Sequence, residues 1–112
     1  MNDCLFCEFN KNMENKVYED DLFFIIKDIN PKANYHYLAI PCKHFKYLSE
    51  MDEYDIANLG KIFAKIAEIA EDVLEIKGGF RLVINQGDNA GQTVPHLHIH
   101  ILGGKKMNWE PA

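Results

Sequence analysis

Three histidines alternate with three aliphatic residues near the end of the sequence, in the stretch His96-Leu97-His98-Ile99-His100-Ile101. A period of two predicts a β-strand, in which successive side chains point to opposite faces of the sheet. The imidazoles therefore share one face, and the aliphatic residues share the face that packs on the core. A row of imidazoles adds little apolar burial, so we expect it to form a metal site or a nucleophile with helper groups. The alternative is three solvated histidines on an edge strand.

The loop before this strand, residues 85–94, is rich in glycine and in small side chains that form hydrogen bonds. Its backbone amides and hydroxyl groups could surround an anion, although the same composition occurs in ordinary connecting loops. Directly before the aligned histidines, it indicates a pocket that holds a phosphate beside a nucleophile. An imidazole suits this task because its reference pKa of about 6.5 leaves it largely unprotonated near neutral pH.

The stretch from Gly91 to Gly104, GQTVPHLHIHILGG, resembles the signature of the histidine-triad (HIT) family of nucleotide hydrolases and transferases. The end of the chain, with Gly103-Gly104-Lys105-Lys106, Trp109 and Pro111, is most similar to the small Hint-type branch. The resemblance covers nearly the whole chain. It implies a single HIT domain over residues 1–112 with a HIT-like fold.

The same resemblance implies roles for the triad. His98 would be the nucleophile that forms a nucleotidyl-histidine intermediate, with a backbone carbonyl fixing its tautomer. His100 would contact the α-phosphate, Thr93 would assist departure of the leaving group, and Gln92 lies where some members touch phosphate. Loop amides would stabilise charge on the equatorial oxygens. His96 is contested, since in relatives without a cysteine pair the first triad histidine belongs to the catalytic network.

Other residues match the family's nucleotide-binding positions. Asp28 fits the aspartate that accepts hydrogen bonds from both ribose hydroxyls, although an aspartate there could simply cap a turn. Asn85 and Gly91 match positions near the phosphates. The apolar positions that sandwich the base are matched by Phe6, Phe9, Ile26, Ile29 and Phe45. These side chains fit a core almost equally well, and both roles could hold at once.

A CxxC pair, Cys4 and Cys7, opens the chain, and an odd total of three cysteines speaks against a disulfide framework. The pair could serve thiol redox chemistry, be two inert thiols, or bind zinc. In CxxC-bearing relatives the first triad histidine can be a zinc ligand, so the resemblance implies a tetrahedral set of Cys4, Cys7, His44 and His96. Such a closed zinc site is structural. Cys42 could substitute as a ligand, because on an extended segment it shares a face with His44.

The composition is that of an ordinary globular protein: 112 residues, of which 47% are hydrophobic and 26% charged. No apolar run approaches the roughly 20 residues that span a bilayer, and no secretory signal is recognisable, so we expect a cytoplasmic protein without a membrane partner. Acidic residues outnumber basic ones by 17 to 12, a net charge of −5, and no basic stripe occurs. This balance argues against a nucleic-acid partner but allows a small phosphorylated ligand.

Patterns along the chain predict an α+β fold with a five-stranded antiparallel sheet, one long helix and a short N-terminal helix. No βαβ alternation is present, which argues against a parallel sheet. The strand-like segments are Val17–Glu19, Leu22–Ile26, Tyr35–Ile40, Phe80–Asn85 and Pro95–Leu102. The first two form a hairpin with Asp20-Asp21 at its turn. On the third, His36 shares a face with Leu38 and Ile40 and is expected to be a hydrogen-bonded core histidine.

The long helix has a capping residue before it and an amphipathic stripe along it. Ser49 or Asp52 is suited to the N-cap, and Gly78-Gly79 is expected to end the helix. The stripe recurs at three and four residues and consists of Leu59, Ile62, Phe63, Ile66, Ala70 and Val73.

These features predict a nucleotidyl hydrolase that acts on purine nucleoside phosphoramidates, such as adenylated amines, through a nucleotidyl adduct on His98. Dinucleoside polyphosphates are the alternative substrates, and a catalytic zinc on the three histidines is an alternative mechanism. From another class, the alternative is a nucleotide-binding scaffold with little turnover. In each nucleotide-based case the small partner is an AMP or GMP derivative.

The sequence also predicts a homodimer. One long helix covers only part of a five-stranded sheet, and the tail carries Trp109, a large ring that is rarely left in water. Hint-type relatives form two-fold dimers in which the C-terminal segment reaches the partner's pocket, so Trp109 is expected beside the other chain's leaving group. The alternative is a tail that folds over its own sheet.

Overall fold

The computed structural model of this chain describes residues 5–12 and 15–109. Five strands form its sheet: β1 (Tyr18–Glu19), β2 (Phe23–Lys27), β3 (Tyr35–Pro41), β4 (Phe80–Val83) and β5 (Ile99–Gly103). The helical elements are α1 (Leu5–Asn12), η1 (Leu48–Glu50), α2 (Glu53–Ile69) and η2 (Asp88–Ala90). Among the described residues, no helix is long and apolar enough to cross a membrane.

The strands lie in the order β1-β2-β3-β5-β4, and all four neighbouring pairs are antiparallel. The pairing of β3 with β5 aligns Leu38 with His100 and Ala39 with Ile99. Both end strands of the sheet are short, and β4 leaves one of its edges unpaired within the described chain. The predicted α+β fold with a five-stranded antiparallel sheet, a long helix and a short N-terminal helix is confirmed.

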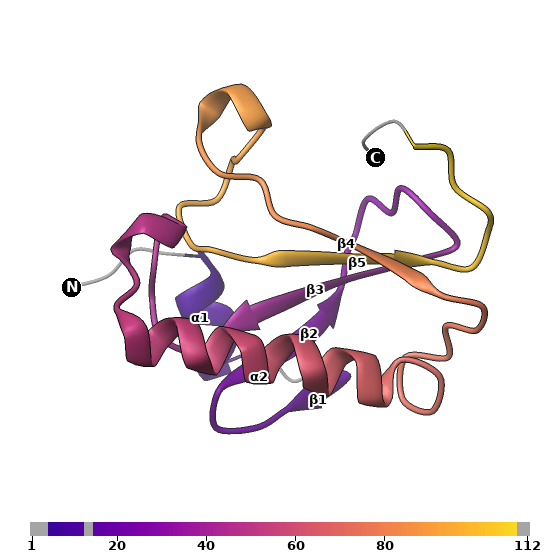
Figure 1. The fold of residues 1–112 in the computed structure, drawn as a ribbon, viewed down its shortest axis with the longest axis horizontal. Helices are drawn as coiled ribbons and strands as arrows, with labels where there is room; N and C mark the ends of the chain where they lie inside the picture. Colours follow the sequence, from indigo (N-terminus) through magenta and orange to yellow (C-terminus); the bar gives the residue numbers. More distant parts are fainter. Residues whose placement is uncertain (1–4, 13–14, 110–112) are drawn as a thin grey trace.

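The two faces of the sheet have different coverings (Figure 1). The long helix α2 packs on one face through Leu59, Ile62 and Ile66, against strand residues such as Ile25 and Ile99. The other face carries the short helix α1, with a second apolar cluster made by Phe6, Phe24, Ile26, Leu38 and Ile40. Alternation along β5 places its isoleucines on the α2 face and its histidine on the α1 face, as the period of two predicts.

Local hydrogen bonds explain two of the turns. Asp20 Oδ1 accepts from the backbone N–H groups of Leu22 and Phe23, which closes the hairpin between β1 and β2. At the start of α2, the Asp52 side chain accepts from Asp55 N, and the Asp55 side chain accepts from Asp52 N. This reciprocal capping box makes Asp52 the N-cap and confirms that alternative over Ser49.

The end of the long helix was predicted wrongly. The helix stops at Ile69 rather than at Gly78-Gly79, and Val73 is 43% exposed instead of facing the core. After Ile69 the chain continues in turns and brings Leu74 and Ile76 into the core, where both are fully buried. Burying these two side chains outweighs extending the helix.

The histidine strand was predicted too long at its start. It begins at Ile99 instead of Pro95, because Pro95 has no N–H for a ladder. The N–H of His96 donates to Val94 O, 2.8 Å away, and the N–H of Leu97 donates to Phe45 O outside the sheet. The first two triad histidines therefore precede the strand: His96 lies in a bend, His98 follows it, and only His100 is on β5.

Gly103 provides a test of how tightly the sheet is packed. A Cβ at this position would lie 2.3 Å from Cγ2 of the buried Ile76. We expect Gly103→Ala to lower the free energy of unfolding by about 1–3 kcal/mol, the usual cost of overpacking. Gly60→Ala is the matched control, because a Cβ there meets nothing within 4 Å; removing a helix glycine should stabilise by about 0.5–1 kcal/mol. Urea unfolding measures both, and equal stability of Gly103→Ala and the wild type would contradict this packing.

Candidate active site

A cavity of about 450 Å³ opens on the α1 face of the sheet. Its walls come from the loop between β2 and β3, from β3, β4 and β5, and from the loop before β5. The lining residues are Asp28, Asn30, Lys32, His36, Val83, Asn85, Gly91, Thr93, His98, His100 and Leu102. Two histidines of the triad, His98 and His100, therefore share one cavity, and a third lining histidine, His36, comes from β3.

His98 is buried, and its protons are placed by the main chain. Nδ1 lies 2.8 Å from the carbonyl oxygen of His96, which can only accept, so Nδ1 carries the hydrogen and Nε2 keeps its lone pair. Burial lowers the pKa of His98, although the hydrogen bond to the His96 carbonyl opposes that shift. The ring of Phe6 packs edge-on against it at 4.9 Å between centroids. At neutral pH the imidazole is thus uncharged, with its unprotonated Nε2 left for the cavity.

His100 has the opposite tautomer to His98, because His36 fixes the position of its ring hydrogen. The main-chain N–H of Lys32 donates to His36 Nδ1 at 2.9 Å, so a neutral His36 carries its proton on Nε2. That nitrogen lies 2.9 Å from His100 Nδ1 and donates to it, which leaves the proton of His100 on Nε2. His100 Nε2 lies 3.5 Å from the Asn85 amide. The cavity therefore contains one imidazole lone pair and one imidazole N–H side by side.

The charge of the cavity is low. Burial, followed by the neighbouring histidines, lowers the pKa of His100 to about 4. Burial also lowers the pKa of His36, although Asp28, whose Oδ2 lies 3.3 Å from His36 Nε2, opposes the shift. These imidazoles are neutral at pH 7, so the charged side chains among the lining residues are Asp28 and Lys32.

His36 is the pocket residue that sequence reasoning assigned to the core. It is buried, at 6% exposed, and fully hydrogen-bonded, as expected, but its partners are Lys32, Asp28 and His100. The sequence shows that His36 shares a face with Leu38 and Ile40, which is correct. The missing information is that β3 lies beside β5, since only that neighbour brings the ring against His100.

Some residues of the loop before β5 line the cavity, and others form hydrogen bonds that hold the loop itself. Thr93 and Gly91 line the cavity, and Gly91 adopts a left-handed φ of 89° where η2 ends. Gln92 does not line it: its Oε1 accepts from Gly87 N at 2.8 Å, and its Nε2 donates to Lys46 O at 2.9 Å. In this arrangement Gln92 holds the loop in place.

The expected nucleotide-binding residues are only partly brought together. Asp28 Oδ1 accepts from Asn30 N at 2.7 Å and so caps the turn, and the residue also lines the cavity, where its contact with ribose stays a prediction. Ile29 is 91% exposed beside it and does not line the cavity. Phe6 and Ile26 are buried in the apolar cluster of the α1 face, with Phe9 packed against it. Phe45 is buried as well, and lines a separate small cavity near α2.

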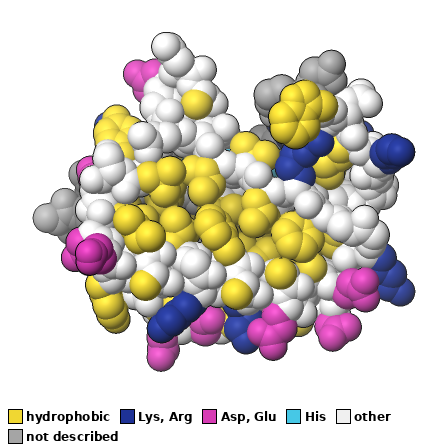
Figure 2. All heavy atoms as spheres, viewed as in Figure 1, with side chains coloured by type: hydrophobic (Ala, Val, Ile, Leu, Met, Phe, Trp, Pro, Cys, Tyr) yellow, Lys and Arg dark blue, Asp and Glu magenta, His cyan; other side chains and the backbone are white. Residues whose placement is uncertain are grey.

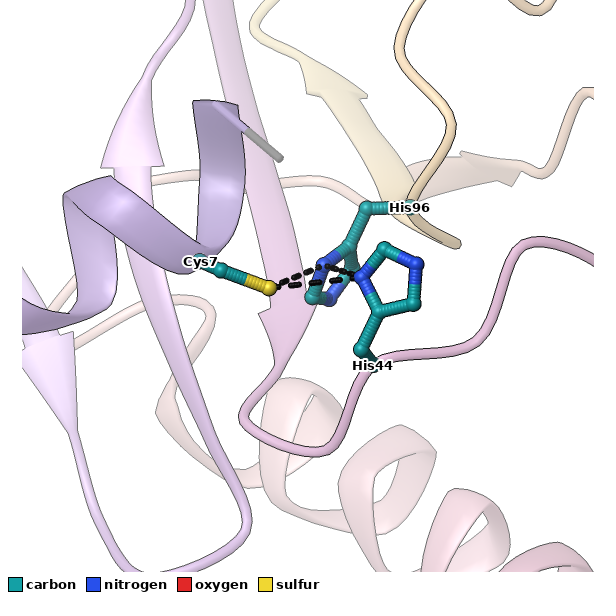
Figure 3. Close-up of side chains that lie close together, drawn as sticks. All are labelled: Cys7, His44 and His96. Carbon is teal, nitrogen blue, oxygen red and sulfur yellow. Dashed lines mark hydrogen bonds between the residues drawn. The ribbon is translucent and has the colours of Figure 1, made fainter. Parts of the chain in front are cut away.

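A second cluster of reactive side chains lies next to this cavity. Figure 3 shows Cys7 on α1, His44 after β3 and His96 before β5 pointing toward one another. Cys7 Sγ lies 3.3 Å from His44 Nδ1 and 3.4 Å from His96 Nδ1, and the two Nδ1 atoms are 3.2 Å apart. His96 Nε2 donates to Pro41 O at 2.9 Å, which leaves its Nδ1 unprotonated toward the cluster. Burial lowers the pKa of His96 to about 4.

The cluster fits a zinc ion. In a tetrahedral site with Zn–S near 2.3 Å and Zn–N near 2.0–2.1 Å, neighbouring ligand atoms are about 3.4–3.6 Å apart. The three measured separations lie close to this range. Cys4, the fourth expected ligand, lies outside the described residues. Cys42 is directed elsewhere, with its Sγ 3.9 Å from Asn10 Oδ1 and from Asp20 O.

Known proteins that are similar to this chain identify its family and its fold. The family model of the HIT domain matches residues 10–107 of the chain. The chain belongs to the HIT family. An uncharacterized HIT-like protein of Synechocystis is 52% identical over 96 residues, which cover 86% of this chain and 83% of the relative.

Solved HIT structures superpose over nearly the whole chain. A histidine triad protein from Clostridium difficile is 38% identical with a TM-score of 0.87, and the match covers 98% of both chains. A HIT family hydrolase from Legionella pneumophila is 34% identical with a TM-score of 0.86, covering 98% of this chain and all of that one. A zinc-bound histidine triad family protein from Mycobacterium smegmatis is 30% identical with a TM-score of 0.76. The match covers 96% of the present HIT protein and 78% of the Mycobacterium chain.

Proposed function

We propose that this HIT protein is a nucleotidyl hydrolase of the Hint type that acts on purine nucleoside phosphoramidates. The observation that carries the proposal is the pair of opposite tautomers in one cavity: an imidazole lone pair on His98 beside an imidazole N–H on His100. The ring centroids of His98 and His100 are 5.1 Å apart. A nucleophile and a hydrogen-bond donor this close together suit attack on phosphorus, where negative charge grows on the oxygens as the new bond forms. The Legionella hydrolase with the same fold supports the reaction class.

The proposed reaction has two steps. Nε2 of His98 forms a bond to the α-phosphorus, the P–N bond breaks, and the amine departs with its electrons and takes up a proton from solvent beside the Thr93 hydroxyl. The His100 N–H donates to a non-bridging phosphate oxygen. Water then attacks phosphorus, the bond to His98 breaks, and a proton is lost to give the nucleoside monophosphate. Each step replaces one bond at phosphorus, so the adduct divides one hard substitution into two easier ones.

The remaining lining residues suit the rest of a nucleotide. Asp28 Oδ2 lies 3.3 Å from His36 Nε2 and has a further lone pair that can accept from the ribose hydroxyls. Asn85, whose amide lies 3.5 Å from His100 Nε2, and Gly91 line the same cavity and suit the phosphate. Lys32 supplies positive charge at the same opening. A volume of about 450 Å³ is in the usual range for a small-molecule site.

The alternative mechanism, the scaffold and the alternative substrates each differ from this proposal in something that can be observed. A catalytic zinc held by the three triad histidines is disfavoured, because His96 turns its Nδ1 toward Cys7 and His44 and away from the cavity. A scaffold with little turnover would not require the matched proton placement on His98 and His100. Dinucleoside polyphosphates would use the same nucleophile, so substrate comparison by rate distinguishes them from phosphoramidates.

We also propose that the cluster of Cys7, His44 and His96 binds zinc, with Cys4 as the fourth ligand. The soft thiolate and two imidazole nitrogens form a donor set that suits this ion. The zinc-bound relative from Mycobacterium smegmatis supports the assignment. With four protein ligands the ion would offer no open position, so its contribution would be to join α1, the loop after β3 and the segment before β5.

We further propose that the chain forms a homodimer through β4 and α2. β4 is an end strand of the sheet, with no further strand beside its outer edge in the described chain, and its residues Phe80 and Leu82 are partly exposed on the α2 face. Figure 2 shows apolar atoms gathered across the face on which α2 and β4 lie in Figure 1. A second copy related by a two-fold axis would pair edge with edge and cover this surface. Trp109 is 94% exposed and so does not pack over its own sheet.

The catalytic assignment is tested by His98→Ala with a fluorogenic adenosine phosphoramidate. Loss of the nucleophile should lower kcat by about 10³-fold or more, whereas affinity for AMP should remain within about threefold. Lys27→Gln, an exposed change next to Asp28 but outside the cavity lining, is the control and should keep full activity. Rapid quench of the wild type with labelled substrate should trap a nucleotidyl adduct on His98. Label on another residue, or turnover without an adduct, would overturn the mechanism.

Zinc binding is tested by metal analysis of protein purified without chelator, with about one ion per chain expected. Cys7→Ser and Cys4→Ser should lose the metal and some stability. Cys42→Ser is the matched control and should retain both, because its thiol points away from the cluster. Metal-free wild-type protein that is folded and active would contradict the zinc site.

Assembly is tested by sedimentation at micromolar concentration, where we expect twice the chain mass of 12.9 kDa. Phe80→Lys should shift the equilibrium to monomer, because it places a charge in the proposed interface. Ile29→Lys, an exposed position on the β2–β3 loop and not on β4 or α2, should remain dimeric. Trp109→Ala should change the preference for leaving groups more than the affinity for AMP. A fully active monomer in the wild type would end the dimer proposal.

A further inference from the structure

His96 connects the cluster of Cys7, His44 and His96 to the cavity histidine His98. The ring of His96 joins Cys7 and His44 through Nδ1, and its main-chain carbonyl accepts the Nδ1 hydrogen of His98 at 2.8 Å. The ring is fully buried and its other nitrogen donates to Pro41 O, so it has both of its polar atoms engaged. The position of residue 96 is thus set by its ring, while its carbonyl sets the tautomer of the nucleophile.

The peptide unit that follows His96 is held at its other end by the same cluster. The carbonyl of His96 and the N–H of Leu97 belong to one planar peptide, so fixing the direction of one fixes the other. The N–H of Leu97 donates to the carbonyl of Phe45, the residue directly after His44. Two of the three cluster residues, His44 and His96, therefore orient the carbonyl that holds His98.

The third cluster residue reaches the nucleophile through its neighbour. Phe6 precedes Cys7 on α1 and is 4% exposed. Its ring packs edge-on against His96 at 6.0 Å and against His98 at 4.9 Å between centroids. Holding Cys7 in the cluster keeps this ring against the imidazole of His98.

From these contacts we propose that the cluster of Cys7, His44 and His96 positions the nucleophile, by orienting the His96–Leu97 peptide so that the His98 lone pair stays on Nε2. This role rests on the proposed function and gives the metal site a catalytic consequence without contact between metal and substrate. When the cluster opens, the peptide between residues 96 and 97 can rotate and His98 can place its hydrogen on either nitrogen. When the hydrogen of His98 is on Nε2, the nitrogen that is left for the cavity has no lone pair with which to attack phosphorus.

The proposal is tested with zinc-loaded wild type, Cys7→Ser and His44→Ala, each studied below its unfolding temperature. Long-range ¹H–¹⁵N spectra report which nitrogen of His98 carries the hydrogen. We expect a single Nδ1–H form in the wild type and a mixture of tautomers in both variants. Because small misplacements of reacting groups are costly, kcat should fall by about tenfold or more in the variants, with AMP affinity changed less than about twofold.

Ile66→Ala separates positioning from general loss of stability. Ile66 is buried under α2 on the opposite face of the sheet, so this variant should be destabilised while its His98 tautomer and kcat stay as in the wild type. If a cluster variant does not fold, wild type stripped of metal by a chelator, with its fold checked by circular dichroism, gives the same spectrum to compare.

An unchanged Nδ1–H form of His98 in folded protein that has lost the cluster would overturn the proposal. Equal changes of tautomer in Ile66→Ala would overturn it as well, because they would show a general effect of stability. Wild type that hydrolyses no nucleotide would refute the proposed function alone, since the tautomer spectrum is read without turnover.

Discussion

The hydrogen bond from His98 Nδ1 to the carbonyl of His96 is the contact on which the chemistry of this site depends. A neutral imidazole has one N–H hydrogen. The nitrogen that carries it is a donor, and only the other nitrogen has a lone pair available to attack or accept. The His96 carbonyl places the hydrogen of His98 on Nδ1. The Lys32 N–H, acting through His36, places the hydrogen of His100 on Nε2. Main-chain groups cannot titrate, so they place these hydrogens more firmly than a second side chain could.

The sheet makes such placement durable. Imidazoles on the α1 face stand over strands whose opposite face is packed by α2, so the supporting backbone is buried on both sides. Burial also lowers the pKa of His98, His100 and His36 and keeps each ring neutral. The same enclosure that holds the His98 ring against the His96 carbonyl therefore also keeps a second proton off Nε2.

Much of this arrangement follows from patterns that are local in the sequence. Alternation alone assigns His98 and His100 to one face, and the capping pattern at Asp52 begins the helix where the structure begins it. The end of the helix could not be read this way, because Leu74 and Ile76 are buried by strands far away in the chain. His36 needed the order of the strands, and the separate direction of His96 needed the bend after Pro95. Ile29 and Gln92 do not line the cavity, so their roles in nucleotide binding stay predictions from resemblance.

The low charge of the cavity has a kinetic consequence. Three neutral imidazoles with one lysine and one aspartate present almost no net field, in a chain whose overall charge is −5. A nucleotide, as the proposed substrate, would not be drawn in from a distance and would meet weak repulsion, so its encounter rate should rise slightly as salt screens the surface. Capture would then depend on short-range hydrogen bonds formed after contact. In the proposed reaction, a product with more negative charge than the substrate would meet no cationic wall, and the burial that keeps the histidines uncharged would favour its release.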